Sequence, residues 1–414
     1  MQSIRIRPMG RRAGTALLLG GVLLLATACG SGSGSGGGSA SGSGAGHRAA
    51  PAAVTGGPSS APKTSAAVVE VEPKDGSQNV APSGALKVSV TSGKLTQVAV
   101  AGADGKPVAG ALAADGSSWV PSGGLAVGTA YTVNAQAVDA KGVATSTSSS
   151  FTTLKPARTA RTIDNITTND SYGVGMIIRV DFQQKVTNKA AAEQAITVEA
   201  SDGTQVKGHW LNEDNWLDLR PQTYWKPGTK VTIHYRTSNV ELSPGVYGNS
   251  DRDESFTIGR SKISTVDAKT HQMSVVEDGA APQTIAVTAG ADDNPSWNGT
   301  MVVFEKDRMA HMVSSTTTIK GPGYDVYEPH ALKITDSGSY VHGNPKAVEF
   351  AGKANISHGC IGLPDTDSGD DGSVAGKFYA DALIGDVVIV KNSVGGQVQP
   401  DNGLGGWNVS WANW

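Results

Sequence analysis

Residues 128–133 read Gly-Thr-Ala-Tyr-Thr-Val, and residues 228–233 repeat the pattern as Gly-Thr-Lys-Val-Thr-Ile. Ser-Phe-Thr-Thr at 150–153 is matched in the same way by Ser-Phe-Thr-Ile at 255–258. In these stretches apolar and polar residues alternate, which is the period of a strand with one buried face. Similar order at similar spacing predicts one β-sandwich present twice. The alternative is that Gly-Thr turns and Phe-Thr strands are simply common in β proteins.

The predicted fold class is therefore mainly β, with immunoglobulin-like sandwiches over residues 67–155 and 156–259. Short alternating runs separated by turn signals are typical of such sandwiches, and the absence of cysteine from both blocks means that neither contains a disulfide. Residues 260–393 form a third block, in which the turn signals are distributed differently and we expect a β-rich domain. Its one convincing helix is at 372–383, where apolar residues recur at four-residue steps.

The chain begins with an export signal over residues 1–29, in which arginines precede an apolar run that ends in Ala-Thr-Ala-Cys. Small residues directly before Cys29 resemble a lipobox, so we expect Cys29 to be lipidated and to anchor the protein on the outer face of the cytoplasmic membrane. An ordinary secretory signal is the alternative, and Arg11 with Arg12 leaves the choice between general and twin-arginine export open. Residues 30–66 are Gly, Ser, Ala and Pro and predict a flexible tether.

The composition argues against nucleic acid as a partner and draws attention to Cys360. The 414 residues have a formal net charge of -3 and no basic field, so nucleic acid is not an expected partner. The chain has two cysteines. If Cys29 is lipidated, Cys360 has no partner in an oxidising environment, and a leftover thiol beside a histidine indicates a nucleophile.

The sequence around Cys360 reads Ser357-His358-Gly359-Cys360, and a second His-Gly pair, His342-Gly343, precedes it. A cysteine that attacks a carbonyl group needs an imidazole within hydrogen-bond reach to hold it as thiolate. The glycine-containing turn can present N–H groups to a developing negative charge. The alternative is a zinc site, but no Cys-x-x-Cys pair accompanies these residues and a fourth ligand is missing.

This spacing, His-Gly followed by Ser-His-Gly-Cys, resembles the YkuD-type L,D-transpeptidases of bacterial cell walls. The whole arrangement is similar to the actinobacterial form, which has a lipoprotein leader, two immunoglobulin-like domains, a catalytic domain and a Trp-bearing tail. The resemblance implies that Cys360 is the nucleophile and His342 the base, oriented by the main-chain carbonyl of Gly343. It also implies that His358 shapes the site and that the N–H groups of Gly359 and Cys360 form an oxyanion hole.

The resemblance further implies a substrate-facing lid tyrosine at Tyr324. The residue two after the nucleophile is commonly Arg or Asn in the family, and here it is Gly362. We expect Asn355 and Ser357 to supply replacement contacts to the substrate. No metal or other cofactor is implied, because the chemistry runs through an acyl-enzyme alone.

The implied reaction is formation of 3-3 cross-links between peptidoglycan stem peptides, the donor losing D-Ala, with carbapenem-type β-lactams as inhibitors. The alternatives are an L,D-carboxypeptidase, an enzyme that attaches proteins to peptidoglycan, and a non-catalytic cell-wall scaffold. The diamino acid of the stem and the oligomeric state stay open. Residues 394–414 contain three tryptophans, and we expect this tail to pack back between the second sandwich and the catalytic domain.

Overall fold

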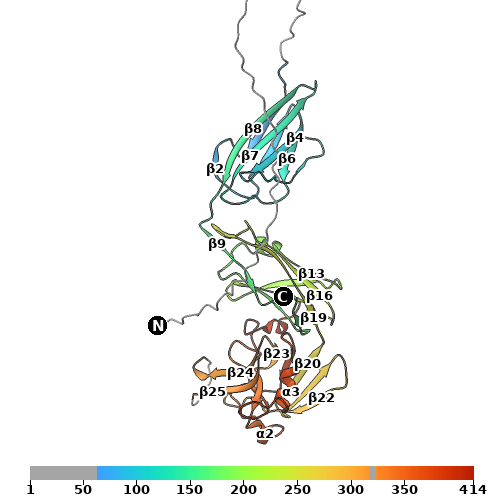
Figure 1. Cartoon of the computed structure of the whole chain (residues 1–414), viewed down its shortest axis with the longest axis vertical. Coiled ribbons are helices and arrows are strands. Elements are labelled where there is room, and N and C mark those ends of the chain that lie inside the picture. The colour runs from blue at the N-terminus through green and yellow to red at the C-terminus, as the bar shows by residue number, and fades with distance from the viewer. Residues whose placement is uncertain (1–62, 317–322) are drawn as a thin grey trace, which may run out of the picture. The chain divides into compact units, whose positions relative to one another are not determined.

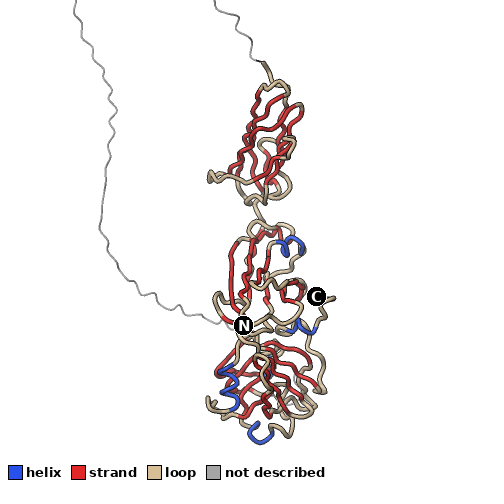
Figure 2. The backbone as a smooth tube through the Cα atoms, turned by 90° about the vertical axis from the view of Figure 1, so that its right-hand side faces the viewer, coloured by secondary structure: helices blue, strands red, loops and turns tan. Residues whose placement is uncertain are grey.

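The computed structural model describes residues 63–316 and 323–414 (Figure 1). Strands dominate these residues, and helices are few and short (Figure 2). The mainly β prediction is therefore confirmed. The predicted signal, tether and lipidated Cys29 lie outside the described residues. In the part of the chain that is described, no helix is long and apolar enough to cross a membrane.

The first sandwich consists of two four-stranded sheets. One sheet contains, in spatial order, β1 (Val68–Glu72), β3 (Lys87–Thr91), β6 (Ser118–Pro121) and β5 (Gly110–Leu112). The other contains β2 (Ser77–Val80), β8 (Ala144–Thr153), β7 (Ala130–Asp139) and β4 (Gly93–Gly102). The alternating residues of β7 point inward and outward in turn, and Val133 and Phe151 are buried in the core between the sheets.

The second sandwich repeats this plan. One sheet contains β10 (Ile163–Asp164), β12 (Ile178–Asp181), β15 (Trp216–Pro221) and β14 (Val206–Leu211). The other contains β11 (Ser171–Tyr172), β19 (Asp251–Ile258), β16 (Lys230–Arg236) and β13 (Ile196–Ala200). The short elements beside them are β9 (Arg158–Ala160), β17 (Glu241–Ser243), β18 (Val246–Gly248) and α1 (Lys189–Gln194).

The repeated sequence patterns occupy equivalent places in the two sandwiches. Tyr131 of β7 lies opposite Phe151 of β8, and Val231 of β16 lies opposite Phe256 of β19. In both sheets the strand with the phenylalanine also pairs in parallel with a short early strand, β2 in one case and β11 in the other. The sequence prediction that one sandwich plan is present twice is confirmed by this shared strand order.

The third block packs two sheets over one core. The five-stranded sheet contains β22 (Gln283–Ala286), β21 (Gln272–Glu277), β20 (Lys262–Asp267), β28 (Val387–Lys391) and β23 (Gly299–Val302). The four-stranded sheet contains β24 (Glu305–Val313), β25 (Asp325–Lys333), β26 (Tyr340–Asn344) and β27 (Ile361–Pro364). Val341 and Ile361 from the second sheet share a buried cluster with Val388 from the first.

Helices in this block are α2 (Ala347–Phe350), α3 (Val374–Asp381) and the 3-10 turns η1 (Ser314–Thr316) and η2 (Gly405–Asn408). Helix α3 is the one expected over 372–383, and it is shorter at both ends. Ser373 caps its N-terminus by accepting a hydrogen bond from the Gly376 N–H, and Ala382 already has an extended backbone. Phe378 of this helix packs into the core beneath the four-stranded sheet.

The tail packs back, as its tryptophans predict. The Trp407 indole N–H donates to the Gly175 carbonyl at 2.7 Å, and that of Trp414 donates to the Lys207 carbonyl at 2.8 Å. Buried Arg220 of the second sandwich lies over the rings of Trp407 and Trp414, 4.7 and 4.2 Å from their centroids. Asn408 meanwhile exchanges hydrogen bonds with the backbone of Thr300 in the catalytic block.

Candidate active site

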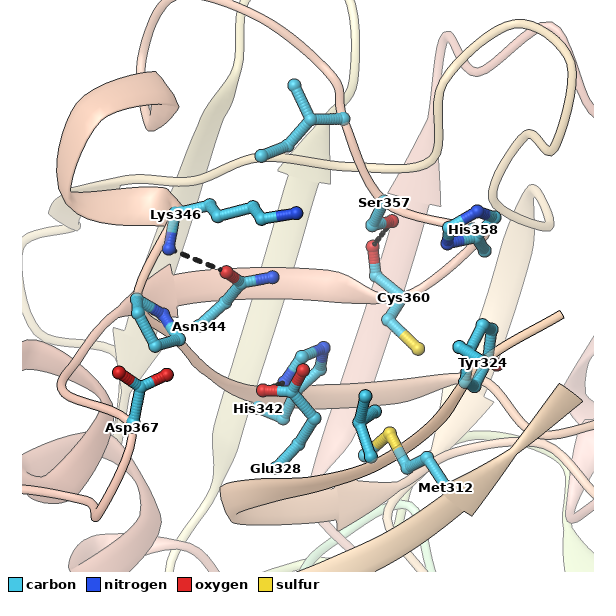
Figure 3. Close-up of a pocket in the computed structure, with 13 residues that line it drawn as sticks. Met312, Tyr324, Glu328, His342, Asn344, Lys346, Ser357, His358, Cys360 and Asp367 are labelled. Carbon is cyan, nitrogen blue, oxygen red and sulfur yellow. Dashed lines mark hydrogen bonds and ion pairs between the residues drawn. The ribbon is translucent and has the colours of Figure 1, made fainter. Parts of the chain in front are cut away.

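Two neighbouring parallel strands bring the Cys360 and His342 motifs together. Strand β26 carries His342, and β27 begins directly after Cys360, with His342 opposite Gly362 in the register. Because parallel neighbours start at the same edge of a sheet, the turn before β27 lies beside the start of β26, two residues before His342. Figure 3 shows the Cys360 and His342 side chains facing the same pocket.

The turn that holds Cys360 is fixed by two serines. The Ser357 hydroxyl donates to the Cys360 carbonyl at 2.6 Å and accepts the Gly359 N–H at 3.2 Å. The hydroxyl of buried Ser296 donates to the Gly359 carbonyl at 2.9 Å. Gly359 has a φ of +118°, a conformation that a residue with a side chain adopts only under strain. The glycine and both serines together define where the Cys360 sulfur points.

His342 is buried and doubly held on its Nδ1 side. Nδ1 lies 2.8 Å from the Gly343 carbonyl oxygen, so the predicted orientation by that carbonyl is present. The Glu328 carboxylate of β25 lies 3.5 Å from the same nitrogen. Burial alone would lower the pKa of His342, but hydrogen bonds and charge interactions with Cys360 and Glu328 raise it to about 10. The imidazole therefore holds its proton at neutral pH.

The pair faces an open cavity of about 340 Å³. Apolar and aromatic side chains form one part of its wall, and polar or charged side chains form the rest (Figure 3). The lining residues are Met312, Tyr324, Val326, Glu328, His342, Asn344, Pro345, Lys346, Ile356, Ser357, His358, Cys360 and Asp367. The combination of an open hollow, a thiol and a protonated imidazole suits attack on a carbonyl group that enters from solvent.

Two of the predicted residues outside the core motif face the cavity. Exposed His358 and half-buried Tyr324 lie side by side, with ring centroids 5.3 Å apart. Both are labelled at one end of the pocket in Figure 3, next to the Cys360 sulfur. Residues 317–322, which precede Tyr324, are outside the described part of the chain. The placement of His358 and Tyr324 is compatible with substrate contact.

Asn355 requires a correction, because the structure does not bring its side chain to the pocket. Its amide oxygen accepts the Ala289 N–H at 2.9 Å and lies 2.9 Å from Nδ1 of His271. Its amide nitrogen donates to the Ala268 carbonyl at 2.9 Å. All of these contacts anchor the nucleophile loop to neighbouring loops, so the polar atoms of Asn355 are already used and the residue is a structural one.

The expected roles of Ser357 and Gly359 also change. Ser357 lines the pocket, but its hydroxyl is engaged inside the turn. Since the Gly359 N–H donates to that hydroxyl, it is not available to an oxyanion in this arrangement. The Cys360 N–H, in contrast, has no hydrogen-bond partner among the described residues. Of the two N–H groups predicted to form an oxyanion hole, that of Cys360 is therefore the one without a partner among the described residues.

Sequence reasoning missed four polar residues of the pocket, Glu328, Asn344, Lys346 and Asp367. Asn344 and Lys346 follow His342 at the end of β26, so their closeness to the histidine was visible in the chain. Glu328 comes from β25, where it precedes a continuously buried run from Pro329 to Leu332. No local motif marks it.

The buried carboxylate of Asp365 lies next to Gly343. Oδ2 of Asp365 lies 2.6 Å from Nδ1 of buried His330, and its Oδ1 accepts the N–H groups of Thr366 and Asp370. A Cβ atom on Gly343 would lie 2.1 Å from Oδ2 of Asp365. A side chain at position 343 is therefore excluded, which explains the glycine next to His342.

The zinc site that was considered as an alternative would need a cluster of metal-ligating side chains. Across residues 63–316 and 323–414, no three His, Cys, Asp or Glu side chains form a group that could hold a metal ion. His342 instead interacts with Cys360 and with Glu328.

Residues 261–390 match the L,D-transpeptidase catalytic domain family, and residues 77–241 match the bacterial Ig domain family. The fold and the site thus define an immunoglobulin-like module followed by an L,D-transpeptidase catalytic domain. L,D-transpeptidase 2 of Mycobacterium tuberculosis (strain CDC 1551 / Oshkosh) is 32% identical over 97% of this chain and 93% of its own length. The chain therefore belongs to the L,D-transpeptidase family, and it is an enzyme of the transpeptidase class.

The comparisons found further similar proteins. L,D-transpeptidase 5 of Mycobacterium tuberculosis (strain ATCC 25618 / H37Rv) is 28% identical over 83% of this chain and 75% of its own length. A solved L,D-transpeptidase in complex with imipenem is 26% identical, covers 55% of this chain and 97% of its own, and has a TM-score of 0.46. L,D-transpeptidase 3 of Mycobacterium tuberculosis, solved with a faropenem-derived adduct, is 26% identical over 56% and 97%, with a TM-score of 0.44.

Proposed function

We propose that this protein is a peptidoglycan L,D-transpeptidase that forms 3-3 cross-links through a thioester on Cys360. The observation that carries the proposal is the pairing of Cys360 with buried His342, whose pKa is raised to about 10, in a cavity open to solvent. A thiol paired with a protonated imidazole combines a nucleophile with a proton donor for the leaving group.

The first half of the reaction starts from protonated His342 beside the Cys360 sulfur, which acts as a thiolate. The sulfur then attacks the carbonyl carbon between the third residue of the donor stem, a diamino acid, and the D-Ala that follows it. The Cys360 N–H donates to the oxygen on which negative charge develops. The C–N bond breaks, His342 gives its proton to the departing nitrogen of D-Ala, and a thioester remains.

In the second half, an amine of a neighbouring stem attacks the thioester carbonyl and transfers a proton to His342. The carbon–sulfur bond breaks, and Cys360 leaves as a thiolate beside the protonated His342, which regenerates the starting pair. Gly343 holds the imidazole through Nδ1 in both steps, while Glu328 stabilises its positive charge. Tyr324 and His358, at one end of the pocket, would contact the stem peptides.

The test is incubation of the full chain with a tetrapeptide-bearing donor and an acceptor stem, followed by mass spectrometry of the protein and of the products. We expect an acyl-enzyme that has lost D-Ala and a 3-3 cross-linked product, and neither with Cys360→Ala. A tripeptide product without cross-link would identify an L,D-carboxypeptidase instead, and linkage to a protein amine would identify a protein-attaching enzyme. Cross-links formed by Cys360→Ala would remove Cys360 from the mechanism.

Carbapenems are expected to acylate the same sulfur, because their strained β-lactam carbonyl offers the thiolate a comparable electrophile. Intact-protein mass spectrometry should show one stoichiometric adduct in the wild type and none in Cys360→Ala. An adduct retained by the variant would place the reactive group elsewhere.

The proposed place of action is the cell-wall space outside the cytoplasmic membrane, with the protein held there by lipid on Cys29. Fractionation of cells expressing the wild type and Cys29→Ala tests this proposal. We expect the wild type in the membrane fraction with the mass of a lipid-modified N-terminus, and the variant in the soluble fraction. Equal distribution of the two proteins would contradict lipid anchoring.

A further inference from the structure

Two buried ionisable side chains lie near the catalytic pair and have no part in the reaction described above. They are His330 of β25 and Asp365, which directly follows β27. Both side chains are 0% exposed, and Nδ1 of His330 lies 2.6 Å from Oδ2 of Asp365. A buried ion pair rarely stabilises a fold more than apolar side chains of the same size would. What such a pair can add to a site is a fixed geometry.

The His330 ring is held on both sides. Its Nε2 lies 3.0 Å from the carboxylate of Asp371, which is exposed and also pairs with Arg308. Because each ring nitrogen faces a carboxylate oxygen, the ring satisfies both carboxylates only as an imidazolium that donates twice. His330 therefore supplies the positive charge that offsets the buried carboxylate of Asp365.

The Asp365 carboxylate is held in one orientation by three donors. Its Oδ1 accepts the N–H groups of Thr366 and Asp370, each at 2.8 Å, and its Oδ2 accepts from His330. Burial would raise the pKa of Asp365, but the hydrogen bonds from these groups lower it below its ordinary value. The charged carboxylate cannot rotate without losing a bond, so Oδ2 keeps one position.

Oδ2 of Asp365 is the atom that lies against Gly343. A Cβ atom on Gly343 would lie 2.1 Å from this oxygen and 2.8 Å from Cβ of Asp365. On the other side, the carbonyl oxygen of Gly343 lies 2.8 Å from Nδ1 of His342. Asp365 thus confines the peptide whose oxygen orients the catalytic imidazole, and its displacement would leave that peptide free to turn.

The backbone of His330 supports a role beyond packing. Although it lies within a strand, His330 has a φ of +50°, a left-handed conformation that residues other than glycine rarely adopt. Strain of this kind persists only where the surrounding structure enforces it, and it occurs preferentially at functional sites. Glu328, two residues earlier in the same strand, contacts His342 directly. Strand β25 therefore reaches the catalytic histidine twice, once directly and once through Asp365 and Gly343.

Resting on the proposed function, we propose that His330 and Asp365 are positioning residues for the catalytic histidine. The pair fixes the Gly343 carbonyl, and this carbonyl directs the imidazole of His342 toward the Cys360 sulfur. Neither His330 nor Asp365 lines the pocket, so loss of either should lower kcat and leave KM unchanged.

The experiment separates the two bonds of His330 in the full chain, with D-Ala release measured over a range of donor concentrations. Asparagine tolerates the left-handed backbone and places its amide nitrogen close to the position of Nδ1, so His330→Asn keeps the bond to Asp365. Glutamine reaches the position of Nε2 instead, so His330→Gln keeps only the bond to Asp371. His330→Gln should lower kcat roughly 10- to 100-fold, whereas His330→Asn should stay within about 3-fold of the wild type.

The two carboxylates provide the second comparison. Asp365→Ala removes Oδ2 from Gly343 and should lower kcat by a factor similar to that of His330→Gln. The matched control is Asp371→Ala, which removes the outer carboxylate, 83% exposed, and should leave both kcat and KM unchanged. Thermal unfolding of each variant gives the folded fraction at the assay temperature, and every rate is expressed per folded molecule.

Several outcomes would overturn the inference alone. These are a wild-type kcat in His330→Gln, equal losses of kcat in Asp365→Ala and Asp371→Ala, and a raised KM at unchanged kcat, which would assign the pair to substrate binding. If Asp365→Ala does not fold, the comparison of His330→Gln with His330→Asn still decides. Absence of an acyl-enzyme on Cys360 in the wild type would instead overturn the proposed function itself.

Discussion

Replacing Glu328 with glutamine should move the alkaline limit of activity to lower pH. Glu328 lies 3.5 Å from Nδ1 of His342 and is one of two groups that raise the pKa of this buried histidine to about 10. An opposite charge at such a distance raises a pKa by roughly 1–3 units, or about 1.4–4 kcal/mol of preference for the protonated form. Glutamine has the same shape without the charge, so the pKa of His342 should fall to about 7–9.

The direction of this shift in the pH profile follows from the role of the protonated His342 side chain. His342 must carry a proton to give to the departing D-Ala nitrogen, so the rate falls as pH rises through the pKa of His342. In the wild type this loss should occur near pH 10, and in Glu328→Gln it should occur about 1–3 units lower. The assay is the pH dependence of kcat/KM for D-Ala release, which reports on groups of the free enzyme.

Two variants separate a change in charge from a change in structure. Glu328→Asp keeps the carboxylate and should retain most of the alkaline range. Asp325→Asn removes an exposed carboxylate from the same strand, where it pairs with His311, and should leave the profile unchanged. If the alkaline limb of Glu328→Gln coincides with that of the wild type, then Glu328 does not control the protonation of His342, and the reasoning fails.

Two further predictions concern packing. Trp414→Ala should lower the free energy of unfolding by about 3–5 kcal/mol, because the ring is buried and covers the Arg220 guanidinium. Trp411 is half-buried, and its ring centroid lies 5.5 Å from Arg220, so Trp411→Ala should lower the free energy of unfolding by less. Equal losses of unfolding free energy for the two variants in denaturant unfolding would contradict this account. Gly343→Ala should cost about 1–3 kcal/mol and also slow acylation, because the new Cβ meets Asp365. Gly123→Ala, where no atom lies within 4 Å of the new Cβ, is the control, and unchanged acylation by Gly343→Ala would refute the clash.

The fold could be predicted where the pattern is local or repeated. The matched stretches at 128–133 and 228–233 place Tyr131 and Val231 at equivalent register positions, since period-two alternation depends only on neighbouring residues. The return of the tail was predictable from the size of its tryptophans, but Arg220, which lies over all three of these rings, was not. Its position depends on the pairing of distant strands, which leaves no signal in a single sequence.

Contacts within the site could be predicted where both interacting residues belong to one sequence motif. His342 and Gly343 are adjacent in the chain, so the hydrogen bond to the carbonyl follows from that neighbourhood. Glu328 reaches His342 across an antiparallel pair, and no spacing rule connects them. Asn355 was wrongly assigned because residue type alone does not show that its amide is used up by the backbone of Ala268 and Ala289.

The glycines beside the catalytic pair show how this site obtains polar groups from its neighbours. At Gly343 the missing side chain leaves room for Asp365, and at Gly362 it leaves room for Asn344. In each case a side chain from an adjacent segment lies close to the space that a side chain at the glycine position would occupy. A substitution at either glycine therefore acts on two residues at once. A Cβ atom at position 362 would lie 2.8 Å from the Thr288 methyl group and 3.3 Å from Cβ of Asn344, so a substitution there is coupled to both neighbours.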